Sequence, residues 1–249
     1  GTRKVWCLLA TCLSSRAVHV ELLAAMDVSS LRLALRRLVA RRGPVSLIRS
    51  DRGTNFVAAA SSAPTDLSKS GFPVKWEFLP AASPHAGGVW ERPVGLIKRA
   101  LEGAFSSLAG RLLNYDEFET LLQEAVAVVN HTPLWSVSAD PLNPAPLAPA
   151  HLLNLKTSPA AAAEDFGQRD ILAYGPRRWR RAQALANAFW KRWRTFYLTE
   201  LHQRNKWRFP RRSLAVRDVV LLRDVNAKRS EWPLGIIDEV FCGTDGLVR

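Results

Sequence analysis

Two short apolar runs near the start of the chain constrain its fold most, because only a three-residue polar turn separates them. Residues 5–13 and 17–23 flank the turn, whose sequence is SSR. Apolar or alternating runs of this length around so short a turn predict an antiparallel β-hairpin. The chain therefore starts with β-structure, and an all-helical fold is excluded.

Strand and helix signals then follow one another along the chain. Residues 27–30 supply N-cap side chains for a helix that Gly43 and Pro44 end. Residues 45–50 predict a strand that carries Asp51 at its carboxyl end. A further strand and two helices are expected at residues 74–79, about 89–108 and from about 115 onward. This order predicts a mixed α/β domain with polar residues at strand ends and helix starts.

The charge of the chain points to a polyanionic partner. Its 249 residues include 35 Lys and Arg against 22 Asp and Glu, which gives a formal net charge of +13. Nine Trp and ten Phe exclude a disordered basic tail as a description of the whole. Three cysteines cannot form a disulfide framework, and no apolar run approaches the length of a membrane span. The start without Met and the apolar end lead us to expect a piece of a longer polypeptide.

Two acidic residues stand at positions suited to metal chemistry. Asp51 follows a predicted strand and precedes RGTNF, and Glu91 begins a predicted helix after PHAGGVW. Hard divalent cations prefer a few carboxylates completed by water and phosphate. Lys98 lies seven residues beyond Glu91, on the same helical face, where it would bind a DNA phosphate. Structural explanations stay open, since Asp before Gly is common in turns and Glu is favoured at helix starts.

The residues around both acids resemble a known family. The strings RAVHVEL, LRRLVARRGPVSLIRSDRGTNF and PHAGGVWERPVGLIKRAL are similar to the integrase core of Bel/Pao-type LTR retrotransposons. Residues from 178 onward resemble the small C-terminal domain found with that core. The resemblance implies an RNase H-like fold whose three acids, Asp, Asp and Glu, bind two Mg²⁺ or Mn²⁺ ions. By this resemblance Asp51 is the second acid and Glu91 the third.

The first acid of the family has no counterpart here. It lies on a strand ahead of the hairpin, and Asp27 matches a helix start instead, where an N-cap is the better interpretation. We therefore expect this stretch alone to be inactive. Arg52 stands where the family more often has a small polar residue, and it adds positive charge beside the expected metal site.

The same resemblance implies the activity and the partners. The complete enzyme would carry out 3′-end processing and strand transfer of element DNA into target DNA. Its partner would be double-stranded DNA, both element ends and target, with no membrane involved. A homo-oligomer is implied for the complete enzyme, as are synthesis in the cytoplasm within a polyprotein and action in the nucleus.

The fold expected overall is an RNase H-like α/β core lacking its first strand, a basic helix, and a small SH3-like β-barrel. The core covers residues 1–135, and a Pro- and Ala-rich extension and linker covers 136–173. Residues 174–249 hold the basic, Trp-rich helix, about 176–203, and the barrel strands, 218–223 and 234–241.

Basic residues gather in this C-terminal part. The candidate nucleic-acid-binding residues are Lys98, Arg52, Arg177, Arg178, Arg181, Lys191 and Arg192, and the residues expected to support the metal site are Asn55, Gly53 and His85. Two roles stay open for the arginines of the basic helix, including Arg194: phosphate contacts, or a solvated helix face. The helical spacing assigns Trp179, Trp190 and Trp193 to the apolar face, and we expect the last two in the core. A second basic cluster consists of the arginines at 36, 37, 41 and 42. We expect it to form a solvated helix face rather than a contact with DNA or with a neighbouring subunit.

Other classes of function remain open. A decayed or repurposed integrase would be a non-catalytic DNA-binding protein, as the missing first acid suggests. A protein-interaction module centred on the Trp-rich helix and the barrel is the third alternative.

Overall fold

The structure of the chain, a computed structural model, describes residues 4–66, 74–80, 87–134, 146–154, 166–172, 178–201, 213–243 and 248. It divides into two compact units, Gly1–Gly95 and Leu96–Arg249. Both units combine helices with two-stranded sheets, so the chain is a mixed α/β protein. Within the described ranges, no helix is both long enough and apolar enough to cross a membrane.

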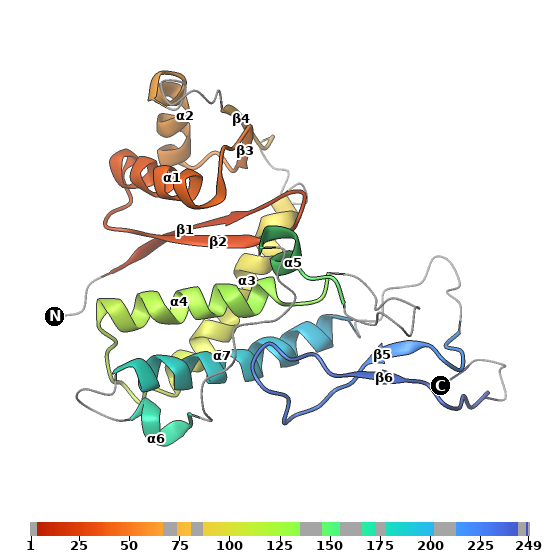
Figure 1. Cartoon of the computed structure of the whole chain (residues 1–249). Helices are drawn as coiled ribbons and strands as arrows, with labels where there is room; N and C mark the ends of the chain where they lie inside the picture. Colours follow the sequence, from red (N-terminus) through yellow and green to blue (C-terminus); the bar gives the residue numbers. More distant parts are fainter. Residues whose placement is uncertain are drawn as a thin grey trace. The chain divides into compact units, whose positions relative to one another are not determined.

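The first unit begins with the predicted hairpin. β1 (Trp6–Thr11) and β2 (Val18–Leu23) pair antiparallel along their whole length (Figure 1). The chain reverses direction at Arg16, which has a φ of 60°. The prediction from the two apolar runs is confirmed.

The first helix begins where its capping residues predict. α1 (Val28–Arg42) has Asp27 as N-cap, and Asp27 Oδ1 accepts the N–H of Ser30 at 2.7 Å. The helix ends at Gly43, whose φ of 88° is a conformation that favours glycine. The interpretation of Asp27 as an N-cap is confirmed, which leaves its side chain in a structural role.

A parallel strand pair completes the first unit. β3 (Leu47–Ser50) pairs in parallel with β4 (Lys75–Phe78), and α2 (Thr54–Asp66) lies between them in sequence. Parallel strands need such a crossover, because a tight turn cannot join them. Helices and strands share one apolar cluster. Its members are Leu31, Leu35 and Ala59, with Leu8, Leu23, Val28, Leu38, Ile48, Phe56 and Trp76 packed against them.

The second unit is built on helices. α3 (Gly88–Ser106) spans the unit boundary, and its residues from Leu96 onward belong here. α4 (Tyr115–Asn130) and α7 (Arg178–Leu201) lie side by side (Figure 1). These helices confirm the predicted ones. Their buried cluster contains Leu108, Leu121, Phe166, Ile171, Ala184, Leu185 and Ala186, with Leu101, Phe105 and Leu113 against it.

Two short helices lie within the stretch predicted as a linker. α5 (Pro149–Asn154) contacts α4, and α6 (Gln168–Ile171) contacts α7. Phe166 and Ile171 are buried in the core of the second unit. The described residues of 136–173 are therefore packed against the rest of this unit, because α5 contacts α4 and α6 contacts α7. The three-domain division itself stays a prediction.

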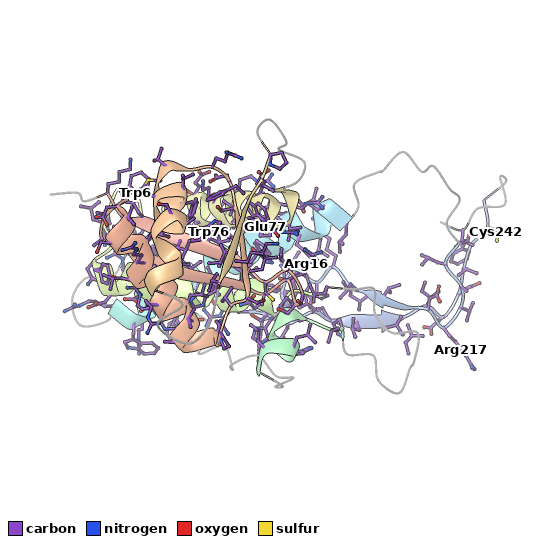
Figure 2. The ribbon with its side chains drawn as sticks, turned by 90° about the horizontal axis from the view of Figure 1, so that it is seen from above. Trp6, Arg16, Trp76, Glu77, Arg217 and Cys242 are labelled. Carbon is purple, nitrogen blue, oxygen red and sulfur yellow. The ribbon has the colours of Figure 1, made fainter. Side chains whose placement is uncertain are left out.

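The C-terminal segment is held on α7. β5 (Val219–Leu221) and β6 (Leu234–Ile236) pair antiparallel, and the described residues form no closed barrel. Upstream of β5 the turn at Arg217 has a φ of 73° (Figure 2). Trp232 packs edge-on against Trp190 and Tyr197 of α7, with ring centroids 5.0 and 5.2 Å apart. Two-stranded sheets are marginal alone, so α7 is the support of this one.

α7 is buried on more than one face, whereas an amphipathic surface helix is buried on one. Trp190 and Trp193 are buried, as predicted. Arg194 is buried too, and donates to the carbonyl oxygens of Val225 at 3.0 Å and Ala227 at 3.4 Å. Trp179, which belongs to the apolar positions by its spacing, is 53% exposed. It lies in the first turn of α7, with its ring edge-on to that of Phe166 and the guanidinium of Arg180 5.7 Å from its centre.

Candidate metal and nucleic-acid site

Hydrogen bonds fix the end of β3, where Asp51 follows. Ser50 Oγ donates to the Asp51 carbonyl at 2.8 Å and accepts the indole N–H of Trp76 at 2.9 Å. The N–H of Leu79 donates to the Ser50 carbonyl at 3.0 Å, which extends the ladder past Phe78. Trp76 lies beside Glu77 on β4 (Figure 2). Sequence reasoning missed Ser50 and Trp76, because a Ser–Trp bond between strands leaves no local signal.

A tight turn then presents the Asp51 carboxylate. The N–H of Gly53 donates to Asp51 Oδ1 at 3.0 Å, and the side chain of Asp51 is exposed. A Cβ atom on Gly53 would lie 3.0 Å from Asn55 Oδ1 and 3.1 Å from Asp51 Oδ1. The structure thus brings Asp51, Gly53 and Asn55 together, and only glycine fits between the two side chains without displacing one.

Arg52 lies next to this turn on the surface. Its Nε donates to the Leu79 carbonyl at 3.4 Å, a long hydrogen bond across to the end of β4. The guanidinium therefore adds positive charge close to the Asp51 turn while remaining exposed.

Glu91 lies in the first turn of α3. Its carboxyl group folds back over the buried Gly87, where an added Cβ would lie 2.9 Å from Glu91 Cδ. A carboxylate is stabilised there by the partial positive charge of the helix N-terminus. The absence of a side chain at Gly87 leaves the space that the Glu91 carboxyl group takes up. His85 lies outside the described residues.

The two carboxylates have the chemistry of a hard-cation site with few protein ligands. Each is exposed and belongs to the first unit. The described residues contain no group of three or more His, Cys, Asp and Glu able to hold a metal ion. Mg²⁺ is commonly bound by one or two carboxylates completed by water and substrate phosphate. Two exposed carboxylates are the type of donor that such an ion takes, and the described residues do not amount to a three-carboxylate site.

The predicted nucleic-acid contacts fall into two groups. Lys98, Arg178, Lys191 and Arg192 are exposed. Arg181 is buried: it donates to the Leu112 carbonyl at 3.2 Å and lies 3.6 Å from a carboxylate oxygen of Glu117. Arg181 thus joins α7 to α4, which takes it out of any surface that meets DNA. Arg177 lies outside the described residues.

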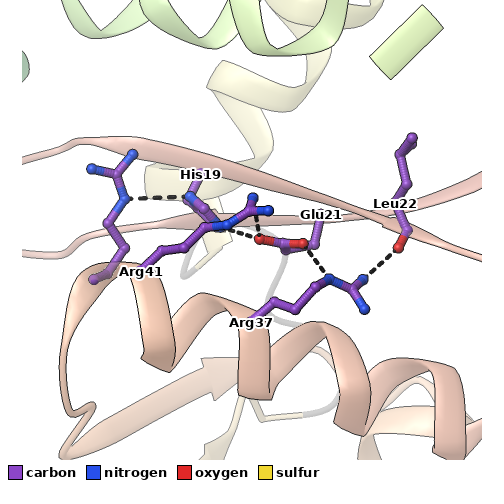
Figure 3. A network of polar contacts seen from close by, with 6 residues as sticks. His19, Glu21, Leu22, Arg37 and Arg41 are labelled. Carbon is purple, nitrogen blue, oxygen red and sulfur yellow. Dashed lines mark hydrogen bonds and ion pairs between the residues drawn. The ribbon is translucent and has the colours of Figure 1, made fainter. Parts of the chain in front are cut away.

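The arginines of α1 are not simply a solvated face. Glu21 on β2 is almost fully buried, and it accepts hydrogen bonds from Arg37 Nε at 2.6 Å and Arg41 Nη1 at 2.9 Å (Figure 3). His19 Nε2 lies 2.8 Å from the same carboxylate, and Arg42 Nε donates to His19 Nδ1 at 3.3 Å. A neutral His19 with its proton on Nε2 satisfies both contacts. The solvated-face interpretation is wrong for these three arginines.

This network lowers the pKa of both His19 and Glu21. Burial lowers the pKa of His19, and the charges of Arg42 and Arg41 add to that, against the hydrogen bond to Glu21. Burial alone would raise the pKa of Glu21, but the bonds from Arg37 and His19 and the charge of Arg41 hold it below its usual value. Glu21 is therefore ionised and His19 neutral at physiological pH. Sequence reasoning missed both, although the alternation in HVEL places them on one side of the strand.

Comparisons with known proteins add two similarities. Residues 177–249 match a family model described as "Family of unknown function (DUF5641)". No curated protein matches the chain. Among solved structures, the chain is similar to a chain of the cryoEM structure of the simian T-cell lymphotropic virus intasome in complex with PP2A regulatory subunit B56 gamma. The identity is 18% and the TM-score 0.45, over 64% of this chain and 52% of that one. This chain therefore spans about half of the chain that it matches.

Proposed function

We propose that this chain is part of an integrase of the kind found in Bel/Pao-type LTR retrotransposons, with an RNase H-like core over residues 1–135. The observation that carries the proposal is the placement of two acids. Asp51 follows β3, the strand that pairs in parallel with β4, and Glu91 lies in the first turn of α3. The sequence around each acid agrees with the resemblance described above.

The two acids would hold Mg²⁺ or Mn²⁺. When bound, the ion supplies Lewis-acid chemistry for phosphodiester exchange. The chain's own residues prepare that site. Gly53 fixes the orientation of the Asp51 carboxylate through its N–H, and Gly87 leaves the space that the Glu91 carboxyl group occupies. Because both carboxylates are exposed, a DNA phosphate is free to complete the coordination.

Basic side chains would bind the substrate. Lys98 is exposed on α3, seven residues from Glu91, and would neutralise a phosphate near the reacting bond. Arg52 adds a further positive charge beside Asp51. The net charge of +13 suits double-stranded DNA, both element ends and target, as the partner. We propose 3′-end processing and strand transfer in the nucleus as the reactions of the complete, oligomeric enzyme.

Strand transfer with Mn²⁺ tests this proposal. The assay uses the natural polypeptide extended upstream of residue 1, since the resemblance implies that the first acid lies there. We expect Asp51→Asn and Glu91→Gln to reduce product to background. Asp27→Asn is the matched control, because Asn caps a helix as well as Asp does and activity should stay unchanged. Full activity of either acid variant would refute the assignment.

One observation favours a second candidate. The described residues contain no group of three or more His, Cys, Asp and Glu that could hold a metal ion. A non-catalytic DNA-binding protein, from a decayed or repurposed integrase, would need none. This candidate is supported if the extended polypeptide binds duplex DNA but gives no strand transfer, and it is excluded if strand transfer occurs and depends on Asp51.

A further inference from the structure

The second unit carries a basic surface where α3 and α7 meet. Arg99 Nη2 of α3 lies 3.6 Å from Glu200 Oε1 of α7, and its guanidinium lies 5.2 Å from the ring centre of Phe196. Four residues further along α3, a Cβ on Gly103 would lie 2.6 Å from Arg192 Cζ, and closer still to Cδ and Nε. The contacts advance along α3 while they go back along α7. The two helices therefore run in opposite directions where they meet. Arg99 and Arg192 belong to two successive contacts between them.

Gly103 gives Arg192 its position. Any side chain at 103 would overlap the outer half of Arg192, so the arginine lies flat against α3 only because residue 103 has none. Arg192 is nevertheless exposed as a whole. A long basic side chain commonly packs its stem on a neighbour and leaves its charge in water. The contact therefore holds the guanidinium of Arg192 at the surface next to α3.

The cations here differ from the other arginines of α7. Arg181 and Arg194 are buried and bonded to carbonyl oxygens. Within the described ranges, no ion pair engages Arg192 or its neighbour Lys191, and both are exposed.

Arg99 is the remaining cation of the contact. Its side chain is 57% exposed and that of Glu200 is 19% exposed, and at 3.6 Å the attraction between them is weaker than in a close ion pair. Glu102 on α3 is the other acid nearby in sequence. A phosphate can therefore replace Glu200 as the partner of Arg99 while Phe196 keeps the guanidinium in place.

We propose that Arg99, Lys191 and Arg192, named here the α3–α7 basic face, bind the phosphate backbone of duplex DNA. Planar guanidinium groups bind phosphate in a bidentate manner, and here they come from two neighbouring helices. The face has no exposed aromatic side chain aimed at bases among these residues, so it recognises backbone rather than sequence. This inference rests on the proposed function for the choice of DNA as the polyanion. It gives a role to α7, the first helix of the region that matches the family of unknown function.

Duplex binding by the full chain in EDTA tests the face without any metal ion. A fluorescent duplex is titrated at several salt concentrations with the wild type, with Arg99→Gln/Arg192→Gln, and with the matched control Arg36→Gln/Arg169→Gln. The control removes the same charge from exposed positions elsewhere. Each lost phosphate contact lowers the salt slope by about 0.9 and the affinity at about 0.1 M salt by roughly eightfold.

We expect the face variant to bind roughly 60-fold more weakly, with a slope reduced by about 2, and the control to bind clearly more tightly than that. Equal losses in the two variants, or a loss without a change in slope, would overturn the proposal. Preference of the face for an acidic peptide over duplex DNA would overturn it as well. Failure of the proposed function is distinguishable, because absent strand transfer with an intact DNA-binding difference leaves this face in place.

Discussion

Replacing Glu21 by Gln tests the polar network of the first unit most directly. The side chain of Glu21 is 4% exposed, whereas those of Arg37 and Arg41 are 40% and 50% exposed. Removing one partner of a fully buried ion pair costs about 3–5 kcal/mol. The half-exposed arginines regain water when the carboxylate is lost, and Gln still accepts one hydrogen bond. We therefore expect a loss of about 2 kcal/mol, below that range.

Hydrogen exchange of the full chain measures this loss locally. Amides of β2 and α1 should exchange roughly 30-fold faster in Glu21→Gln, the equivalent of about 2 kcal/mol. Glu77→Gln is the control, since Glu77 makes the same kind of pairs with Arg49 and Lys75 on the surface. We expect little change there. If both variants exchange alike, the network contributes nothing beyond an ordinary surface pair and the reasoning fails.

The same network predicts how acid acts on the first unit. Both pKa values lie below the ordinary ones, 6.5 for His19 and 4.5 for Glu21. A group with a lowered pKa stabilises the fold above its ordinary value, and that contribution is lost as the pH falls through the lowered one. Protection of β2 and α1 should therefore fall in two stages, below pH 6.5 and again below 4.5. In Glu21→Gln the second stage should be smaller. Protection that rises on acidification would contradict the assigned signs.

Two further predictions concern α4 and α7. Asn114 accepts the N–H of Glu117 at 2.8 Å, and Glu117 Oε2 accepts the N–H of Asn114 at 2.9 Å. Loss of this capping box in Asn114→Ala should cost about 1 kcal/mol in urea unfolding, whereas Asn114→Asp should be close to neutral; equal effects would exclude the capping role. Burial raises the pKa of Tyr197 to about 12. An absorbance titration of tyrosinate should thus show one tyrosine that ionises only near pH 12, and this signal should be absent in Tyr197→Phe. If the signal persists in that variant, it belongs to another tyrosine.

Local signals made much of the first unit predictable. The hairpin follows from two apolar runs and a short turn, and α1 follows from Asp27 and Gly43 at its ends. The turn that joins Asp51, Gly53 and Asn55 is equally local, so the sequence was sufficient to group those residues. Each of these features depends on residues within a few positions of one another.

Contacts between distant segments were not predictable in this way. Helical periodicity groups the residues that share a face, but it does not tell how many faces are covered. α7 is covered by α4 near Arg181 and by residues 225–232 near Arg194, so both arginines are buried. Glu21 likewise depends on Arg37 and Arg41, which come from another element. The roles of Gly87 and Gly103 depend on the side chains that lie over them, which are those of Glu91 and Arg192.

Because β5 and β6 depend on α7 for support, the two strands can be transferred to another polypeptide only together with that helix. Three-residue strands carry too little structure to persist alone, and here Trp232 packs on Trp190 and Tyr197 while Arg194 donates to the carbonyl oxygens of Val225 and Ala227. A recombination event that took the strands without the helix would deliver an unfolded tail. The match to the family of unknown function begins one residue ahead of Arg178 and so covers the helix together with the strand pair.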